Sequence, residues 1–308
     1  MEPPLGSGSL VAGEIADQPE AWRRAAMLSA TTPPFRPGAR TALVGCGSSW
    51  HAASAIAALR EQAGGGETDA YAASEARLER DYAQVIAISR SGRTSELLSA
   101  IEDIPTGVEK LALVGDPASP VAAVCDRAID FAFADDRSVV QTRFVTSVVA
   151  YGRAALGSSL DDAISDARVA MDGSLALEPP DAEQLVFLGQ GWCVALAHAA
   201  ALVARETAQA RTEAHPAMEY RHGPIATAGP GTVVWFIGAA PDGLASEIEA
   251  TGATVLLSAL DPLAELVRVQ RIALSLAERR GLDPDRPPNL SRAVVLGGSD
   301  APEEEFAG

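Results

Sequence analysis

The chain has 308 residues, of which 47% are hydrophobic and 21% charged, so it is long enough for two globular domains with ample core. The formal net charge of −17 disfavours nucleic acid and anionic membrane surfaces as partners. The three cysteines are scattered without metal-ligand spacing, which favours a reduced compartment and no metal site.

Apolar strand candidates alternate with helical candidates along the first half of the chain. The predicted strands are Thr41–Val44, Val85–Ser89, Leu111–Val114 and Ala128–Phe133, and the predicted helices span about residues 49–63, 94–103, 119–125 and 139–158. Strands that alternate with helices indicate a parallel sheet with helices on both faces.

The second half opens like the first, with an apolar strand, a glycine turn and a helix. The predicted strands are Gln184–Leu188, Thr232–Ile237 and Ala253–Leu257, and the predicted helices span about residues 192–210 and 262–280. The shared opening is a weak internal repeat, and it indicates a second α/β unit.

Composition suggests where one domain ends and the next begins. The segment Glu178–Asp181, which contains two prolines, is typical of a linker. We therefore expect a first domain at residues 8–177, including an N-terminal helix, and a second domain at residues 178–297. Residues 1–7 and the acidic residues 298–308 are predicted to be disordered tails.

The run Ser89-Arg90-Ser91-Gly92-Arg93-Thr94 places hydroxyls and a glycine where a predicted buried strand turns into a helix. A helix N-terminus has unpaired N–H groups and the positive end of the helix dipole, so hydroxyls placed there suit a phosphate. A plain Ser/Thr-rich cap explains the same residues. This turn alone leaves both interpretations open.

A second hydroxyl-bearing turn, Gly45-Cys46-Gly47-Ser48-Ser49-Trp50-His51, follows the first predicted strand. The carboxyl ends of neighbouring parallel strands face one crevice, where ligands bind. Two such turns therefore favour a phosphate site over a simple helix cap. The predicted phosphate ligands are the hydroxyls of Ser48, Ser49, Ser89, Ser91 and Thr94.

These turns and the segment His222-Gly223-Pro224 resemble motifs of the SIS (sugar isomerase) domain family, in particular the isomerase half of glucosamine-6-phosphate synthase. The resemblance includes the entry segment Glu14–Glu20 and the tail Asp285–Arg292. It implies an α/β fold of two tandem SIS domains, each a flavodoxin-like parallel sheet flanked by helices. The short connection between Leu257 and Asp261 predicts that the second sheet is trimmed.

The resemblance also implies which residues contact the substrate. In that family the two hydroxyl turns bind the sugar phosphate, which agrees with the ligands named above. Further substrate contacts are implied for Gly47, Val139, Gln141, Thr142 and Arg292. At one of these positions, Gln141 replaces the serine that is usual in the family.

A catalytic pair follows from the same resemblance. Glu206 matches the family's catalytic glutamate at the end of a long helix, and His222 matches the histidine that opens the sugar ring. Moving a proton between C1 and C2 needs a carboxylate that reaches both carbons, and ring opening suits a group that titrates near neutrality. Without the resemblance, a solvated helix-end carboxylate and a loop histidine would be the simpler interpretations.

The chain departs from the synthase at the positions of its covalent chemistry. Val203 and Ala199 stand where the synthase has a lysine and a glutamate, and Arg292 replaces the lysine that forms a Schiff base with the ketose. Arginine stays protonated and forms no imine, although it could contact substrate oxygens. Lys110, the only lysine, lies far away in the first half. We also expect no glutaminase activity, because the chain has no N-terminal catalytic cysteine.

These observations predict a cofactor-free phosphosugar aldose–ketose isomerase or deaminase for a hexose or hexosamine 6-phosphate. It would be similar to a glucosamine-6-phosphate deaminase or a fructosamine-6-phosphate deglycase. A non-catalytic sugar-phosphate sensor is the alternative, since SIS domains also serve as ligand-binding modules in regulators. A synthase subunit supplied with ammonia by a partner is disfavoured by Val203 and Arg292.

Partners and location follow from the resemblance and from the hydropathy of the chain. The resemblance implies a homodimer in which the His222 loop reaches the neighbour's active site. No apolar run reaches the roughly 18 residues of a membrane span, and the N-terminus lacks the pattern of a signal peptide. We expect a cytoplasmic protein.

Overall fold

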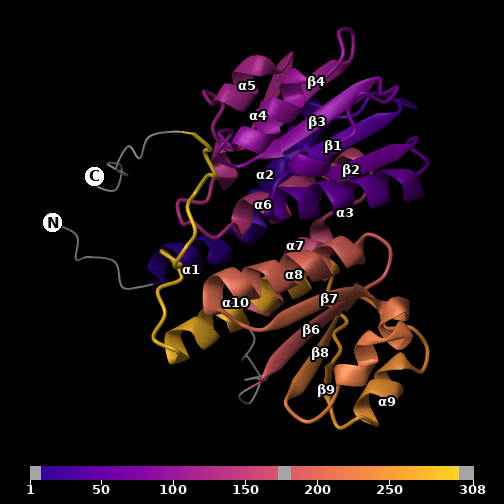
Figure 1. The fold of residues 1–308 in the computed structure, drawn as a ribbon, viewed down its shortest axis with the longest axis vertical. Helices are drawn as coiled ribbons and strands as arrows, with labels where there is room; N and C mark the ends of the chain where they lie inside the picture. Colours follow the sequence, from indigo (N-terminus) through magenta and orange to yellow (C-terminus); the bar gives the residue numbers. More distant parts are fainter. Residues whose placement is uncertain (1–7, 173–181, 298–308) are drawn as a thin grey trace, which may run out of the picture.

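The computed structural model describes residues 8–172 and 182–297, and it contains two parallel sheets separated by a shared layer of helices (Figure 1). The predicted linker Glu178–Asp181 and the predicted tails at residues 1–7 and 298–308 lie outside the described residues. The exact domain boundaries therefore stay a prediction. No helix within the described residues is long and apolar enough to cross a membrane.

The first sheet has five parallel strands in the order β2-β1-β3-β4-β5. This order is flavodoxin-like, and its topological switch point lies between β1 and β3. Both of these strands are buried at every residue, as parallel strands covered on both faces should be. The strands are β1 (Thr41–Gly45), β2 (Thr68–Ala72), β3 (Gln84–Ser89), β4 (Glu109–Val114) and β5 (Arg127–Asp130).

Alternate residues of these strands enter different cores, because successive side chains of a strand point to opposite faces. Leu43 and Ile86 pack on the inner face with α2, α3 and α6, whereas Val44 and Val85 pack on the outer face with α4 and α5. The helices of this half are α1 (Ser9–Ala16), α2 (Gln18–Thr31), α3 (Ser48–Gln62), α4 (Ser95–Glu102), α5 (Pro120–Val124), α6 (Arg143–Ala155) and α7 (Asp161–Asp172), with short 3-10 turns η1 (Ala73–Glu75) and η2 (Ala132–Ala134).

The second sheet has four parallel strands in the order β7-β6-β8-β9, which repeats the first four positions of the first sheet. This arrangement agrees with the predicted repeat and the trimmed second sheet. Phe187 and Trp235 face the shared inner core with α8 and α10, and Val186 faces η3 and α9. The elements are β6 (Gln184–Gly189), α8 (Cys193–Ala208), β7 (Thr212–Pro216), η3 (Ala217–His222), η4 (Pro224–Thr227), β8 (Thr232–Ile237), α9 (Leu244–Glu249), β9 (Thr254–Leu256) and α10 (Pro262–Arg279).

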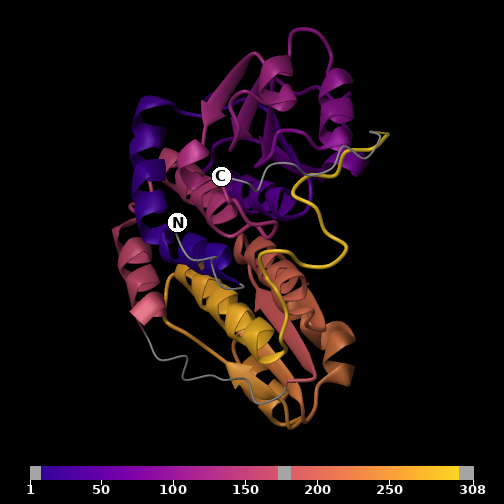
Figure 2. The ribbon, with the colours of Figure 1, turned by 90° about the vertical axis from the view of Figure 1, so that its left-hand side faces the viewer.

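Both ends of the described chain cross between the halves (Figure 2). Helix α1 packs against α10, and the carboxylate of Asp285 accepts hydrogen bonds from the backbone N–H groups of Leu10 and Val11. The chain beyond α10 then returns to the first sheet. There Ser95 N donates to Val294 O at 3.1 Å.

The fold differs from the sequence prediction in several places: helices α7 and α9 are not among the predicted helices, and β5 ends at Asp130 rather than at Phe133. Strands β2 and β7 are not predicted, because both lie at the edge of a sheet and are only partly buried, so neither has an apolar run. The helix predicted from residue 139 begins at Arg143 instead. The carboxylate of Asp136 accepts the backbone N–H groups of Arg143 and Phe144, and thereby fixes residues 136–142 as a loop before the helix.

Candidate functional site

The two hydroxyl-bearing turns meet at the switch point of the first sheet. Gly45 of β1 is paired in register with Ile88 of β3, so the residues that follow leave adjacent strands at the same carboxyl edge. Ligands of open α/β sheets bind in this crevice. The structure therefore brings together the turns at Gly47–Ser49 and Ser89–Thr94.

In the turn after β3, two buried serines organise the backbone. Ser89 Oγ accepts a hydrogen bond from Gly92 N at 2.9 Å, and Ser91 Oγ accepts one from Arg93 N at 3.3 Å. Each hydroxyl keeps its own hydrogen for a further acceptor, such as a phosphate oxygen. Thr94 is the N-cap of α4, and its side chain makes no capping hydrogen bond.

In the turn after β1, Ser48 and Ser49 begin α3 and are 6% and 3% exposed. Neither hydroxyl caps the helix. Gly47 has φ +52°, a conformation that L-residues other than glycine rarely adopt, so the turn from strand to helix depends on this glycine. Two more hydroxyls are thus placed at the N-terminus of a helix beside the first turn.

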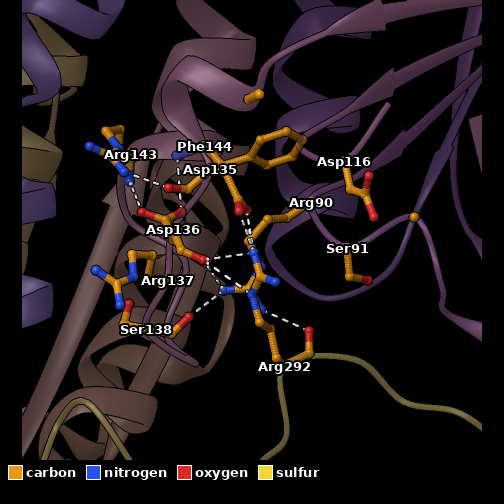
Figure 3. Close-up of polar contacts among 12 residues, drawn as sticks. Arg90, Ser91, Asp116, Asp135, Asp136, Arg137, Ser138, Arg143, Phe144 and Arg292 are labelled. Atoms are coloured by element: carbon orange, nitrogen blue, oxygen red, sulfur yellow. Dashed lines mark hydrogen bonds and ion pairs between the residues drawn. The ribbon is translucent and has the colours of Figure 1, made fainter. Parts of the chain in front are cut away.

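Arg90 belongs to the turn at Ser89–Thr94, which we call the phosphate-type turn. Its side chain makes hydrogen bonds to the loop at residues 135–142 (Figure 3). Its side chain is buried, and one nitrogen donates to the carbonyl oxygens of Ser138 at 2.6 Å and Val139 at 3.1 Å. The other terminal nitrogen donates to the carbonyl oxygen of Arg292 at 2.7 Å. The sequence analysis does not identify this role, because these partners lie far from Arg90 along the chain.

The guanidinium of Arg292 is paired within the chain. It contacts both carboxylate oxygens of Asp135 at 2.5 Å and donates to the carbonyl oxygen of Asp136 at 3.1 Å. Figure 3 shows Arg90 and Arg292 next to each other, with Asp135 and Asp136 beside them. The tail residue is therefore at the site, while its contact with a substrate stays a prediction.

The loop at residues 135–142 contains the other predicted sugar contacts. Thr142 is fully buried and its hydroxyl donates to Asp136 at 3.1 Å, so here it supports the loop. Gln141 Oε1 is buried and has no hydrogen-bond partner in the described part of the chain. That oxygen is an acceptor left over for a hydroxyl donor. Val139 is half-buried, and its carbonyl oxygen is held by Arg90.

Glu206 lies half-buried in the last turn of α8. Burial raises the pKa of Glu206 to about 7, against the opposing attraction of Arg90 and Arg205. The second half of the chain thus presents a carboxylate to the charge of Arg90 in the phosphate-type turn. A carboxylate with a pKa near the operating pH is well suited to act as a general base.

His51 and His198 connect the two halves near the same turn. The rings stack with centroids 5.7 Å apart, His51 coming from the first turn of α3 and His198 from α8. Burial, together with His198 and Arg205, lowers the pKa of His51 to about 4, so this ring is neutral at physiological pH. A neutral ring in this position fits a packing contact in the crevice.

His222 is exposed at the end of η3. Its neighbour Arg221 forms an ion pair with Glu247 of α9 at 2.7 Å, which holds this segment against α9. Within residues 8–172 and 182–297, no hydrogen bond or ion pair joins His222 to Glu206. The contacts of a single chain therefore do not assemble the predicted catalytic pair, and the role of His222 stays a prediction.

Lys110 lies at the opposite edge of the first sheet. It is the second residue of β4 and pairs in register with Val85 at the amino end of β3. Since the sequence contains no other lysine, no lysine amine reaches the crevice at the carboxyl edge.

A flavodoxin-like parallel sheet that bears hydroxyl turns at its switch point, with a second sheet of the same strand order, is consistent with two tandem SIS domains. The recognition made from the motifs is confirmed: the chain is similar in sequence to glutamine–fructose-6-phosphate aminotransferases (isomerizing) and shares the fold of solved phosphosugar isomerases and deaminases. No family model matches the sequence.

The similarity to known proteins covers most of the chain. The chain is 27% identical over 315 aligned residues to a glutamine–fructose-6-phosphate aminotransferase (isomerizing) from Gloeobacter violaceus. The alignment covers 83% of this chain and 52% of the relative. The chain thus spans about half the length of the curated relatives that it matches.

Two solved structures share the fold. Glucosamine-6-phosphate deaminase from Thermotoga maritima has a TM-score of 0.79 at 23% identity, covering 94% of this chain and 100% of that one. Tagatose-6-phosphate ketose/aldose isomerase from Escherichia coli has a TM-score of 0.76 at 18% identity, covering 90% and 95%.

Proposed function

We propose that the protein is a phosphosugar aldose–ketose isomerase or amino-sugar-phosphate deaminase that acts on a hexose or hexosamine 6-phosphate. The observation that supports this most strongly is the position of Glu206. It is a half-buried carboxylate with a pKa of about 7, and it faces buried Arg90 of a hydroxyl turn at the switch point. A base beside an anion site suits a substrate with a phosphate at one end and a mobile proton at the other.

In this proposal the substrate is held at both ends. The phosphate binds among the hydroxyls of the two turns, and Gln141 Oε1 accepts a hydrogen bond from a sugar hydroxyl. In the open-chain hexosamine, the Glu206 carboxylate takes the proton from C2 while the carbonyl oxygen O1 gains a proton from solvent, which gives an enolamine. Glu206 then returns its proton to C1 while the nitrogen loses one to solvent. The resulting imine at C2 adds water and releases ammonia, leaving the ketose phosphate. With a hexose, the same proton transfer passes through an enediol and stops at the ketose.

The single lysine favours deamination or isomerisation over amine transfer from glutamine. Arg292 is engaged with Asp135 and stays protonated, and Lys110 lies at the far edge of the sheet, so neither forms an imine with a ketose. A glucosamine-6-phosphate deaminase-like or a fructosamine-6-phosphate deglycase-like reaction fits the remaining groups. The solved deaminase that shares this fold supports including amino sugars among the candidates.

A substrate panel tests the proposal. Glucosamine 6-phosphate, fructose 6-phosphate and a fructosamine 6-phosphate are offered to the wild type and to Glu206→Gln, and ammonia, amine and ketose release is followed. We expect turnover of at least one compound, and a loss of about a hundredfold or more in kcat for Glu206→Gln, because a general base is removed. Glu109→Gln is the matched control, since this half-buried carboxylate lies at the amino edge of the sheet.

The competing function is a sugar-phosphate sensor without catalysis. It is favoured by the exposed position of His222, which leaves ring opening without its predicted acid or base inside one chain. Binding of a sugar phosphate with no turnover of any compound would support the sensor. Turnover undiminished in Glu206→Gln would reject the proposed mechanism.

A homodimer with a shared active site belongs to the same proposal. An exposed His222 on η3 is available to a neighbouring copy, as the family resemblance implies. A cytoplasmic location likewise stays a prediction.

A further inference from the structure

We propose that Glu14 of α1 is a positioning residue, which holds the loop at residues 135–142 against Arg90 by acting as a neutral, hydrogen-donating carboxyl group. The substrate side of this inference rests on the proposed function, because the loop contains the predicted sugar contacts. The inference itself comes from the hydrogen bonds around the loop.

Glu14 makes hydrogen bonds to the loop that are separate from those made by Arg90. Its side chain is 5% exposed, and Oε1 accepts hydrogen bonds from the backbone N–H groups of Arg137 at 2.5 Å and Ser138 at 3.1 Å. Its second oxygen, Oε2, lies 2.5 Å from Ser138 Oγ. On the other side, Arg90 donates to the carbonyl oxygens of Ser138 and Val139. The loop is therefore held by hydrogen bonds both to α1 and to the phosphate-type turn.

The hydrogens around Ser138 decide the protonation of Glu14. Ser138 Oγ has one hydrogen, yet it lies within hydrogen-bond distance of two acceptors, Glu14 Oε2 at 2.5 Å and Val140 O at 2.7 Å. A carbonyl oxygen only accepts, so both contacts can be satisfied at once only when the serine hydrogen goes to Val140 O. The contact with Oε2 is then satisfied when Glu14 holds a proton and donates it to Ser138 Oγ. A charged Glu14 would leave one of the two contacts without a hydrogen.

The neighbouring carboxyl group, Asp136, has more hydrogen-bond donors to support a negative charge than Glu14 has, although burial raises the pKa of Asp136 as well. Each of its oxygens accepts hydrogen bonds, from the backbone N–H groups of Thr142, Arg143 and Phe144 and from the Thr142 hydroxyl. N–H groups only donate, so both oxygens of Asp136 must remain acceptors. It also lies at the N-terminus of α6, where the helix dipole favours a negative charge.

The charges around Glu14 agree with this assignment. Asp136 repels a negative charge on Glu14, and Arg90, which attracts both carboxyl groups, is also close to Arg292 and Asp135. Burial first, and then Asp136, raises the pKa of Glu14 to about 7. The carboxylate of Asp285 lies at the first turn of α1, where it accepts hydrogen bonds from the backbone N–H groups of Leu10 and Val11.

Glu14 acts on the proposed phosphate site only through other residues. Glu14 fixes Ser138, whose carbonyl oxygen anchors Arg90, and Arg90 in turn stands in the turn that would bind phosphate. Without Glu14, the backbone N–H groups of residues 137 and 138 lose their acceptor. The loop then loses its defined position relative to Arg90 and to Gln141, and sugar-phosphate binding should weaken.

Three variants test this role in a Glu206→Gln background, which removes the carboxyl group of the proposed base and slows turnover. Glu14→Gln keeps one acceptor oxygen and replaces the donated O–H by N–H, so it should bind fructose 6-phosphate within about twofold of the background. Glu14→Ala should weaken binding by about tenfold or more. Glu20→Gln, an exposed glutamate on α2, is the matched control and should change nothing.

The pH dependence distinguishes a neutral Glu14 from a simple packing contact. In the background protein, affinity measured by calorimetry should fall as the pH rises through about 7, because Glu14 loses its proton. Glu14→Gln should remove this fall. The infrared spectrum should show a protonated-carboxyl C=O band at pH 6 that Glu14→Gln lacks and Glu20→Gln retains.

The infrared measurement needs neither turnover nor ligand, so it separates this inference from the proposed function. If no sugar phosphate binds to any variant, the proposed substrate class is wrong while the protonation of Glu14 is still decided by the band. The inference is overturned if the band is absent, if Glu14→Gln binds as poorly as Glu14→Ala, or if Glu14→Ala binds like the background.

Discussion

Two carboxyl groups at this site share a pKa near 7 but need opposite protonation states. Burial is the main cause of the raised pKa of both Glu206 and Glu14. Glu206 has to lose its proton to act as a base, whereas Glu14 has to keep its proton to complete the bonds of Ser138. The proposed chemistry is therefore confined to a window around neutral pH, set by one residue from each half of the chain.

The pH–rate profile should report both residues. As the pH rises through about 7, the fraction of ionised Glu206 increases and kcat/KM rises on the acidic limb. The alkaline limb should come from Glu14 and should disappear in Glu14→Gln, with the acidic limb unchanged. Steady-state rates from pH 5 to 9 check this. An acidic limb near pH 4.5, the ordinary value for a glutamate, would contradict the burial of the base.

At the scale of elements, the phosphate-type turn depends on Gly92. This residue has φ +61°, and a Cβ atom there would lie 1.9 Å from Ser119 Oγ at the start of α5. The glycine thus permits both the left-handed backbone and the close approach of α5 to the turn. Ser89 Oγ also accepts the N–H of Gly92, so the position of this glycine fixes the serine hydroxyl.

Replacing this glycine should damage the site more than the fold. Gly92→Ala has to shift the turn away from Ser119, and we expect fructose 6-phosphate affinity to fall by about tenfold or more, with a loss of about 1–3 kcal/mol in the free energy of unfolding. Calorimetry and urea denaturation measure the two effects. Gly13→Ala is the control: it lies in α1 with open space around a Cβ, and should be neutral or stabilising by up to about 1 kcal/mol. Equal affinity in the two variants would show that the turn does not hold the ligand.

The sequence predicts the buried strands and the two turns well, because these depend on local patterns. β1 and β3 are apolar runs followed by glycine and serine, and their adjacency follows from a general rule for parallel sheets. Strand β2, with the sequence TDAYA, lacks such a pattern because it is an edge strand exposed on one side. Its pairing with β1 is set by the tertiary fold instead.

The network around Arg90 could not be predicted in the same way. Glu14 is part of a recognised entry motif, but its partner Ser138 is 124 residues away, and no local spacing reports that contact. The sequence indicates Arg292 as a substrate contact, whereas the structure pairs it with Asp135. In both cases the role of the side chain depends on its partner: Ser138 shares a hydrogen with Glu14, and Asp135 provides the charge opposite to that of Arg292.

At the scale of the whole molecule, the site lies between two halves that must keep a fixed relation. Arg90 comes from the first half and Glu206 from the second, so movement at the junction would change the distance between the proposed phosphate site and the proposed base. Arg153 of α6 is central to this junction. Its guanidinium makes two hydrogen bonds to Asp261 at the start of α10, at 2.8 and 2.9 Å, and lies 5.1 Å from the ring of Trp192 before α8.

Removing Arg153 should therefore loosen the junction. The side chains of Arg153 and Asp261 are 13% and 12% exposed, so Arg153→Leu leaves a largely buried carboxylate without its partner. We expect the free energy of unfolding to fall by about 2–4 kcal/mol, and Arg153→Leu/Asp261→Asn to recover part of this loss, because the unpaired charge is removed. KM should rise more than kcat falls, since the phosphate and the base are no longer held at one distance. Urea denaturation and steady-state kinetics measure both effects.

Arg23→Leu is the control. It removes the exposed pair with Glu20 and should lower the free energy of unfolding by less than about 0.5 kcal/mol. If Arg153→Leu lowers the free energy of unfolding as little as this control does, the junction is held by apolar packing of the shared helix layer alone.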